Sequence, residues 1–134
     1  MDFDARTIAL GLARGRVVVG IVASLLPRLA TGAAPGAFGP RVGPLGRMLG
    51  ARDLALGAGA VTSIKEKTHD AEWVGMGAIV DIADGVALLA TRRLPVRARF
   101  IGIGALGAGV LGLFLARKLA DERTVADDEE MLGV

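Results

Sequence analysis

The feature that most constrains this chain is an uncharged run of 17 residues at positions 100–116, which ends abruptly at Arg117 and Lys118. A helix of about 17 to 25 apolar residues is long enough to cross the hydrocarbon core of a bilayer. Basic residues at the end of such a helix anchor it among the lipid headgroups. A helix of a soluble bundle needs a polar face, and this run has none. The run therefore predicts a transmembrane helix.

The composition favours helices that pack against each other in lipid. Apolar residues make up 52% of the chain, the mean hydropathy is +0.52, and 20 residues are glycine, whereas aromatic residues account for only 4%. Small residues let helix backbones approach closely in a bilayer. The absence of cysteine excludes disulfides and thiolate chemistry, and a single histidine makes a zinc site unexpected. We expect neither a metal nor a cofactor.

Three further apolar segments, each interrupted by charges, accompany the uncharged run. The four segments cover residues 7–29, 45–64, 71–91 and 100–116. A loop rich in glycine and proline, residues 31–44, separates the first two. Segments of this length joined by short loops predict an all-α fold, a four-helix transmembrane bundle. We expect residues 1–118 to form a single four-span membrane domain and residues 119–134 to form an acidic, solvent-exposed tail.

Four spans place both termini on the same side of the membrane. The 16 Lys and Arg residues then divide equally between the two sides, so the positive-inside rule predicts no orientation. We expect an integral protein of a bacterial plasma membrane, with the lipid bilayer as its surroundings. Nucleic-acid binding is disfavoured, because no basic face extends beyond the helix ends and no aromatic platform accompanies it.

Small residues form stripes along the second and fourth segments. Residues three and four apart lie on one helix face, and small residues there favour close helix packing. The second segment has two such stripes, which predicts a central position in the bundle, with Asp53 where a neighbouring helix comes nearest. The stripes are Gly46, Gly50, Asp53, Gly57 and Ala60; Ala51, Ala55, Gly59 and Ser63; and, in the fourth segment, Gly104, Ala108, Gly112 and Ala116.

Charged residues inside the apolar segments are the candidates for a functional site. Asp81 and Asp84 are three residues apart and share one helix face. A carboxylate inside a bilayer is costly unless it is paired or hydrated. We therefore expect an intramembrane network of three acids and four bases, which comes close to neutral. Its members are Arg14, Arg16, Arg47, Arg52, Asp53, Asp81 and Asp84.

Two interpretations of this network stay open. In the structural interpretation, the ion pairs specify how the helices pack, or the arginines reach the headgroup level. In the functional interpretation, Asp81 and Asp84 relay protons or line a cavity for a small ligand. The sequence favours the structural interpretation, since arginines are available to pair with the aspartates.

The polar connections between the apolar segments contain fewer candidate functional residues. Asp70 is expected to cap the third helix, and His69 beside it is expected to be solvated. Four arginines around the last connection are expected to hold anionic lipid headgroups or to serve as a plain anchor. They are Arg92, Arg93, Arg97 and Arg99.

Three features give the chain a resemblance to a group of membrane proteins. They are an Arg-Gly-Arg entry at residues 14–16 with a Pro-Arg exit at residues 27–28, the run Leu-Gly-Ala-Arg-Asp-Leu-Ala-Leu-Gly at residues 49–57, and the two aspartates of the third segment. The chain resembles uncharacterised four-span membrane proteins frequent in actinobacteria and is loosely similar to the DoxX-like group. The resemblance implies the fold and the membrane location, without an established activity, and suggests association with membrane redox complexes.

The sequence contains no constellation of catalytic residues, so a non-catalytic role is favoured over an enzymatic one. We expect a scaffold or accessory subunit of a membrane complex, which binds a protein partner or further copies of itself through its small-residue faces. The alternative is a small transporter or proton-coupled carrier that uses Asp81 and Asp84.

Overall fold

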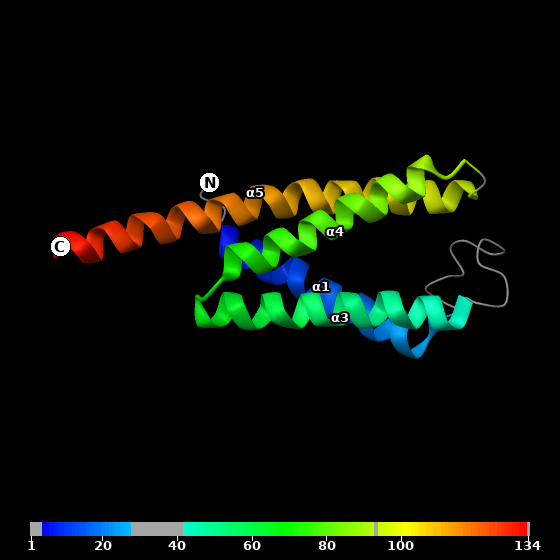
Figure 1. Ribbon diagram of the computed structural model, residues 1–134, viewed down its shortest axis with the longest axis horizontal. Helices are drawn as coiled ribbons and strands as arrows, with labels where there is room; N and C mark the ends of the chain where they lie inside the picture. The colour runs from blue at the N-terminus through cyan, green and yellow to red at the C-terminus, as the bar shows by residue number, and fades with distance from the viewer. Residues whose placement is uncertain (1–3, 28–41, 93, 134) are drawn as a thin grey trace.

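The computed structural model describes residues 4–27, 42–92 and 94–133. These residues form four α-helices and no strand (Figure 1). The predicted all-α four-helix bundle is thereby confirmed. Most of the predicted loop at residues 31–44 lies outside the described residues. The helices are α1 (Ala5–Leu25), α3 (Val42–Glu66), α4 (Asp70–Ala90) and α5 (Val96–Leu132).

Local sequence determines both ends of α1. The carboxylate of Asp4 accepts a hydrogen bond from the Arg6 N–H at 3.1 Å and another from the Thr7 hydroxyl, which caps the helix. The hydrogen bond from the Thr7 hydroxyl is the main cause that holds the pKa of Asp4 below its ordinary value. At the other end the Leu26 N–H bonds the Val22 carbonyl at 2.8 Å, and Pro27 follows, which has no N–H to continue the helix.

The turn between α3 and α4 differs from the predicted one. His69, not Asp70, occupies the capping position of α4, in a left-handed conformation (φ 51°) and without a side-chain capping bond. The expectation that Asp70 caps the helix is therefore wrong. Asp70 is the first residue of α4, and it is 1% exposed because its carboxylate is turned into the bundle.

Helix α5 is much longer than the uncharged run that predicted it. It has 37 residues, and its C-terminal part projects beyond the other helices (Figure 1). After Arg117 the chain contains no proline, and no glycine before Gly133, so nothing stops the helix earlier. The predicted domain boundary at residue 118 thus lies inside α5. Leu119 is fully buried, whereas most of residues 120–129 are exposed.

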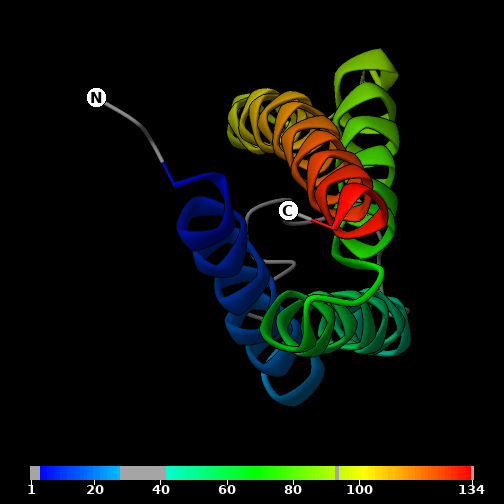
Figure 2. The ribbon, with the colours of Figure 1, turned by 90° about the vertical axis from the view of Figure 1, so that its left-hand side faces the viewer.

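The four helices are arranged as two hairpins. Helix α1 packs along α3, and α4 packs along α5, whereas contacts between the two hairpins are far fewer. Figure 2, which views the molecule along its length, shows the two pairs facing each other. The boundary between the hairpins is therefore the loosely packed part of the bundle.

Each hairpin is held together by glycines at its helix crossing. A Cβ added to Gly50 would come within 2.5 Å of the Ser24 nitrogen, and one added to Gly20 within 2.5 Å of the Leu54 nitrogen. In the other hairpin, a Cβ at Gly85 would lie 2.8 Å from the Gly102 carbonyl oxygen. Backbones this close exclude any side chain. The predicted first stripe of the second segment does face a neighbouring helix, namely α1.

Among the described residues, three helices are long and apolar enough to cross a membrane: Ala5–Leu25, Asp70–Ala90, and Val96–Glu129 within α5. Only 22%, 22% and 28% of an apolar 18-residue stretch of each, respectively, is buried inside the molecule. Large apolar side chains therefore cover the outside, including Leu25 at 72%, Phe100 at 69% and Val110 at 63% exposure. Such a surface requires lipid or another protein around it.

Helix α3 stands apart from the other three. Every 18-residue stretch of α3 contains at least three of its charged residues, so α3 does not reach the apolarity of a span by itself. Its length of 25 residues, about 38 Å, nevertheless exceeds the 21 residues of α1 and of α4. The charged residues of α3 are Arg47, Arg52, Asp53, Lys65 and Glu66.

Candidate functional site

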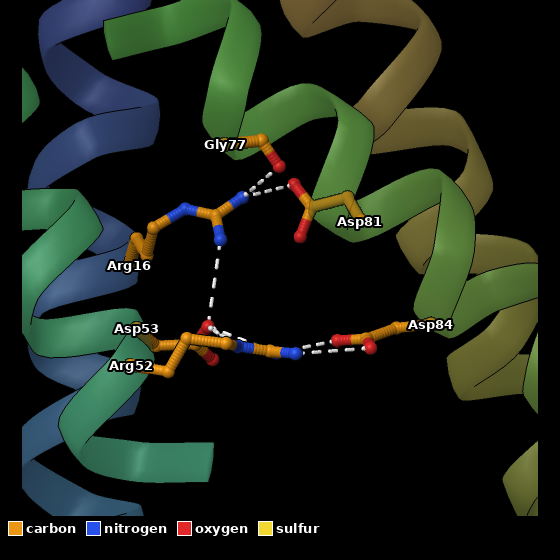
Figure 3. Close-up of polar contacts among 6 residues, drawn as sticks. All are labelled: Arg16, Arg52, Asp53, Gly77, Asp81 and Asp84. Atoms are coloured by element: carbon orange, nitrogen blue, oxygen red, sulfur yellow. Dashed lines mark hydrogen bonds and ion pairs between the residues drawn. The ribbon is translucent and has the colours of Figure 1, made fainter.

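Arg16 of α1 crosses from one hairpin to the other. Its Nη2 donates to the Gly77 carbonyl oxygen of α4 at 3.0 Å and to the Asp81 carboxylate, and its Nη1 donates to Asp53 Oδ1 of α3 at 3.4 Å (Figure 3). The Arg16 guanidinium lies close against Gly77, since a Cβ there would be in van der Waals contact with it at 3.4 Å. Arg16 thus connects three helices.

Arg52 of α3 forms a second connection between the hairpins. Its Nη2 lies 2.5 Å from Asp84 Oδ2 and its Nη1 lies 3.1 Å from Asp84 Oδ1, which is a two-pronged pair of charge-assisted bonds. The same guanidinium also donates to Asp53 Oδ1, from Nη2 at 3.1 Å and from Nε at 3.3 Å. Both guanidiniums therefore converge on one oxygen of Asp53, as Figure 3 shows.

Five of the seven predicted network residues come together, and two do not. Arg14 and Arg47 are exposed and form no ion pair with any described residue. The expected near-neutral balance of three acids and four bases changes accordingly. The cluster contains two guanidiniums and three carboxylates, which leaves one surplus negative charge when all five are ionised. The five, here called the mid-bundle cluster, are Arg16, Arg52, Asp53, Asp81 and Asp84.

The mid-bundle cluster lies halfway along the helices. Asp81 follows the first residue of α4 by 11 positions, or about 16 Å of helix. A hydrocarbon core is about 30 Å thick, so a bilayer that surrounds α4 places the cluster near its midplane. Ionisable groups at that depth are rare and costly, and they typically mark a pathway or a binding site.

A cavity of about 360 Å³ opens beside the cluster, between the two hairpins. All four helices contribute to its wall. Its polar lining consists of Arg16, Asp53 and Asp81, and the rest is apolar or small, with Trp73 as its one aromatic side chain among the described residues. Arg52 and Asp84 do not line it. The volume falls in the range of small-molecule sites, which are mostly apolar with a few polar groups.

A second charged network, around Asp70, lies at the end of the bundle that holds the α3–α4 turn. Asp70 Oδ2 accepts from Arg6 Nη1 of α1 at 2.7 Å, and its Oδ1 accepts from Arg123 Nη2 of α5 at 2.8 Å. Arg6 also donates to the Ile64 carbonyl oxygen of α3 at 3.2 Å. These contacts join all four helices at one point. Sequence reasoning missed them, because the partners are more than 50 residues apart and Asp70 resembled a simple cap.

The arginines of the α4–α5 connection are at the opposite end from Asp70. Arg92, Arg97 and Arg99 are exposed and form no ion pair within the part of the chain that the structure describes; Arg93 lies outside that part. Their free guanidiniums are compatible with the expected contact to lipid headgroups.

The described residues contain no group of three or more His, Asp or Glu side chains arranged to hold a metal ion. In the mid-bundle cluster, guanidiniums occupy the positions between the carboxylates. The chain matches no protein-family model, no curated protein and no solved structure. The site must therefore be interpreted from its own geometry.

Proposed function

We propose that the chain is a small integral protein of the bacterial plasma membrane that acts as a proton-coupled carrier, with its substrate in the cavity between the two hairpins. The observation that carries this proposal is the surplus carboxylate of the mid-bundle cluster, at mid-depth and beside the cavity. A surplus charge in an apolar environment binds a counter-ion, and a proton is the smallest one.

Asp81 is the residue best placed to exchange that proton. It lines the cavity, and only Arg16 pairs with it among the described residues. At the level of the mid-bundle cluster the hairpins are connected by guanidinium–carboxylate bonds, whereas their shared apolar core lies nearer to Asp70, around Ile64 and Leu119. Breaking the bond between Arg16 and Asp81 would remove one of the two charged connections between the hairpins at this level, and the pair of Arg52 and Asp84 would be the other bond to open in a movement of the kind that alternating access needs.

The test is a pair of variants on one helix, Asp81→Asn and Glu72→Gln. Each removes one carboxylate charge from α4, but Glu72 lies outside the cavity and is half-exposed. Purified protein is placed in liposomes with an internal pH dye, and pools of organic cations, anions and neutral solutes are added across a pH gradient. The expected result is dissipation of the gradient by one pool, lost in Asp81→Asn and kept in Glu72→Gln. Equal fluxes in the two variants would refute the proposal.

A second candidate function is the scaffold or accessory subunit that the small-residue faces suggest. It is supported by α5, where Gly104 and Gly107 have open space around them instead of a neighbouring helix. Exposed Ile103 and Val110 border them. A helix of a partner subunit, or of another copy, fits such a face. Native mass spectrometry after extraction in mild detergent tests this: a defined additional protein mass supports the scaffold, and a lone chain counts against it.

The relation to the DoxX-like group and the association with membrane redox complexes stay predictions. Under the scaffold proposal, the additional mass is expected to belong to such a complex.

A further inference from the structure

The chemistry of the cavity narrows the class of substrate. Its wall consists mainly of alanine, glycine, leucine and valine residues, together with the indole of Trp73. Such a wall favours a ligand with an apolar body. An indole face next to an apolar cavity also attracts a cationic group.

The charged groups that line the cavity also favour a cationic ligand. Helix α1 contributes Arg16, α3 contributes Asp53 and α4 contributes Asp81, whereas the lining residues of α5, Ala108 and Gly112, are uncharged. Arg16 is already engaged by both carboxylates and by a backbone carbonyl oxygen. The three charged groups together carry one net negative charge, so the cavity repels an anion and favours a cation over a neutral molecule of the same shape.

The pair of Arg52 and Asp84 behind the cavity leaves this balance unchanged. The two groups are matched in charge and lie within 2.5 Å to 3.1 Å of each other. Seen from the cavity they act as a nearly neutral unit. The net charge that a ligand meets is therefore set by the lining residues.

We infer that the cavity binds a monovalent organic cation with an apolar body, in competition with a proton for the surplus charge of Asp53 and Asp81. The inference rests on the proposed carrier function and specifies its substrate class. One site that holds either the cation or the proton couples their movements in opposite directions, so that the cation leaves on one side as the proton enters from the other.

Trp73 provides a direct readout of binding. It is the only tryptophan of the chain, and tyrosine is absent, so the indole emission comes from this one position in the cavity wall. The probes are benzyltrimethylammonium and its uncharged carbon analogue, neopentylbenzene, which have nearly the same shape. Each is titrated into the protein in detergent at several pH values.

The expected result has three parts. Benzyltrimethylammonium binds at least about tenfold more tightly than neopentylbenzene. Its affinity falls as the pH is lowered, and binding in weak buffer releases about one proton per cation. Asp81→Asn reduces the affinity by about tenfold or more, whereas Glu72→Gln leaves it unchanged. Should Asp81→Asn fail to fold, Asp53→Asn removes the same charge from the same cavity.

Two results overturn the inference: equal affinity for the two probes, or unchanged cation affinity in both Asp81→Asn and Asp53→Asn. A failure of the carrier proposal would give a different experimental result from a failure of the ligand class. If benzyltrimethylammonium binds with the expected dependence on Asp81 but dissipates no pH gradient in liposomes, the ligand class stands and transport is refuted. If an anion or a neutral solute instead drives flux through Asp81, transport stands and the ligand class is refuted.

Discussion

Removing Asp84 alone, or together with Arg52, separates the effect of net charge from the effect of cavity shape. Neither residue lines the cavity. Asp84→Asn leaves the Arg52 charge without its main partner and makes the mid-bundle cluster neutral. The double variant Arg52→Gln/Asp84→Asn removes both charges and restores the surplus negative charge on Asp53 and Asp81. The single variant is therefore expected to lose cation binding, and the double variant is expected to regain it.

The size of the effect follows from the geometry. Arg52 stays paired with Asp53 in the single variant, but its charge is no longer offset by Asp84, and it acts on the ligand over roughly 8 Å, taken as the usual spacing between packed helices. With an effective dielectric constant of about 20, that interaction is about 2 kcal/mol, or roughly thirtyfold in cation affinity. The double variant removes both members of the pair, so neither is left as an uncompensated charge at mid-depth, and replacing a whole ion pair in an apolar environment is often nearly neutral for stability. We expect the double variant to unfold within about 1 kcal/mol of the unmodified protein.

The assay is the same Trp73 titration with benzyltrimethylammonium, and thermal unfolding of each variant followed by circular dichroism serves as the control. Cation affinity is expected to fall about thirtyfold in Asp84→Asn. In the double variant it is expected to return to within about threefold of the affinity of the unmodified protein. Retained affinity in Asp84→Asn would refute the argument from surplus charge. Loss of cation binding in both variants, with intact folding, would show that Arg52 and Asp84 act through the shape of the cavity.

The remaining predictions concern packing and topology. Gly50→Ala places a Cβ 2.5 Å from the backbone of α1 and is expected to cost about 1 to 3 kcal/mol of unfolding free energy, whereas Gly104→Ala fills open space and is expected to be neutral; thermal unfolding in detergent compares the two. Asp70→Asn leaves two partly exposed arginines facing a neutral amide and is expected to cost about 2 to 3 kcal/mol in the same assay, in contrast to the exposed control Asp127→Asn. Because the chain has no cysteine, Thr91→Cys and Asp127→Cys give a clean topology test. An impermeant maleimide is expected to label them from opposite sides of the membrane, and labelling from the same side would contradict the arrangement of the spans.

The sequence predicted the helices better than their rotation about their own axes. Apolar length indicates that a helix is present, but not which face meets a neighbour. Arg14 and Arg16 are two residues apart, about 200° around a helix, so only one of them can face the bundle. Arg47 is five residues before Arg52, about 140° away, and it points outward for the same reason. Helical periodicity applied to the charged residues therefore reduces the predicted network of seven to the observed cluster of five.

Contacts between distant segments were beyond the reach of the sequence pattern. The partners of Asp70, Arg6 and Arg123, come from near the two ends of the chain, and no periodicity relates them. The end of α5 was misplaced because the apolar run gives the length of a span, not of a helix. Alanine, leucine, lysine, arginine and glutamate residues, which have good helix propensity, continue the helix past Arg117, and most of the residues after Leu119 are exposed.

Glycine contacts occur within each hairpin and charged contacts occur between the hairpins, and this difference suggests how the two hairpins move. Within each hairpin, glycines bring backbones into contact, as at Gly50 on Ser24 and Gly85 on Gly102, and such packed crossings have no alternative arrangement nearby. Between the hairpins, buried apolar side chains such as Ala9, Ile64 and Leu119 pack at the Asp70 end, and guanidinium–carboxylate bonds connect the hairpins at mid-length. When Asp81 binds a proton, its charge-assisted bond with Arg16 is lost, which weakens the connection, while the pairs of Arg16 with Asp53 and of Arg52 with Asp84 keep their charges. The hairpins are therefore expected to move as rigid units about the Asp70 network, where Asp70 stays buried and doubly paired, while the mid-bundle cluster opens and closes.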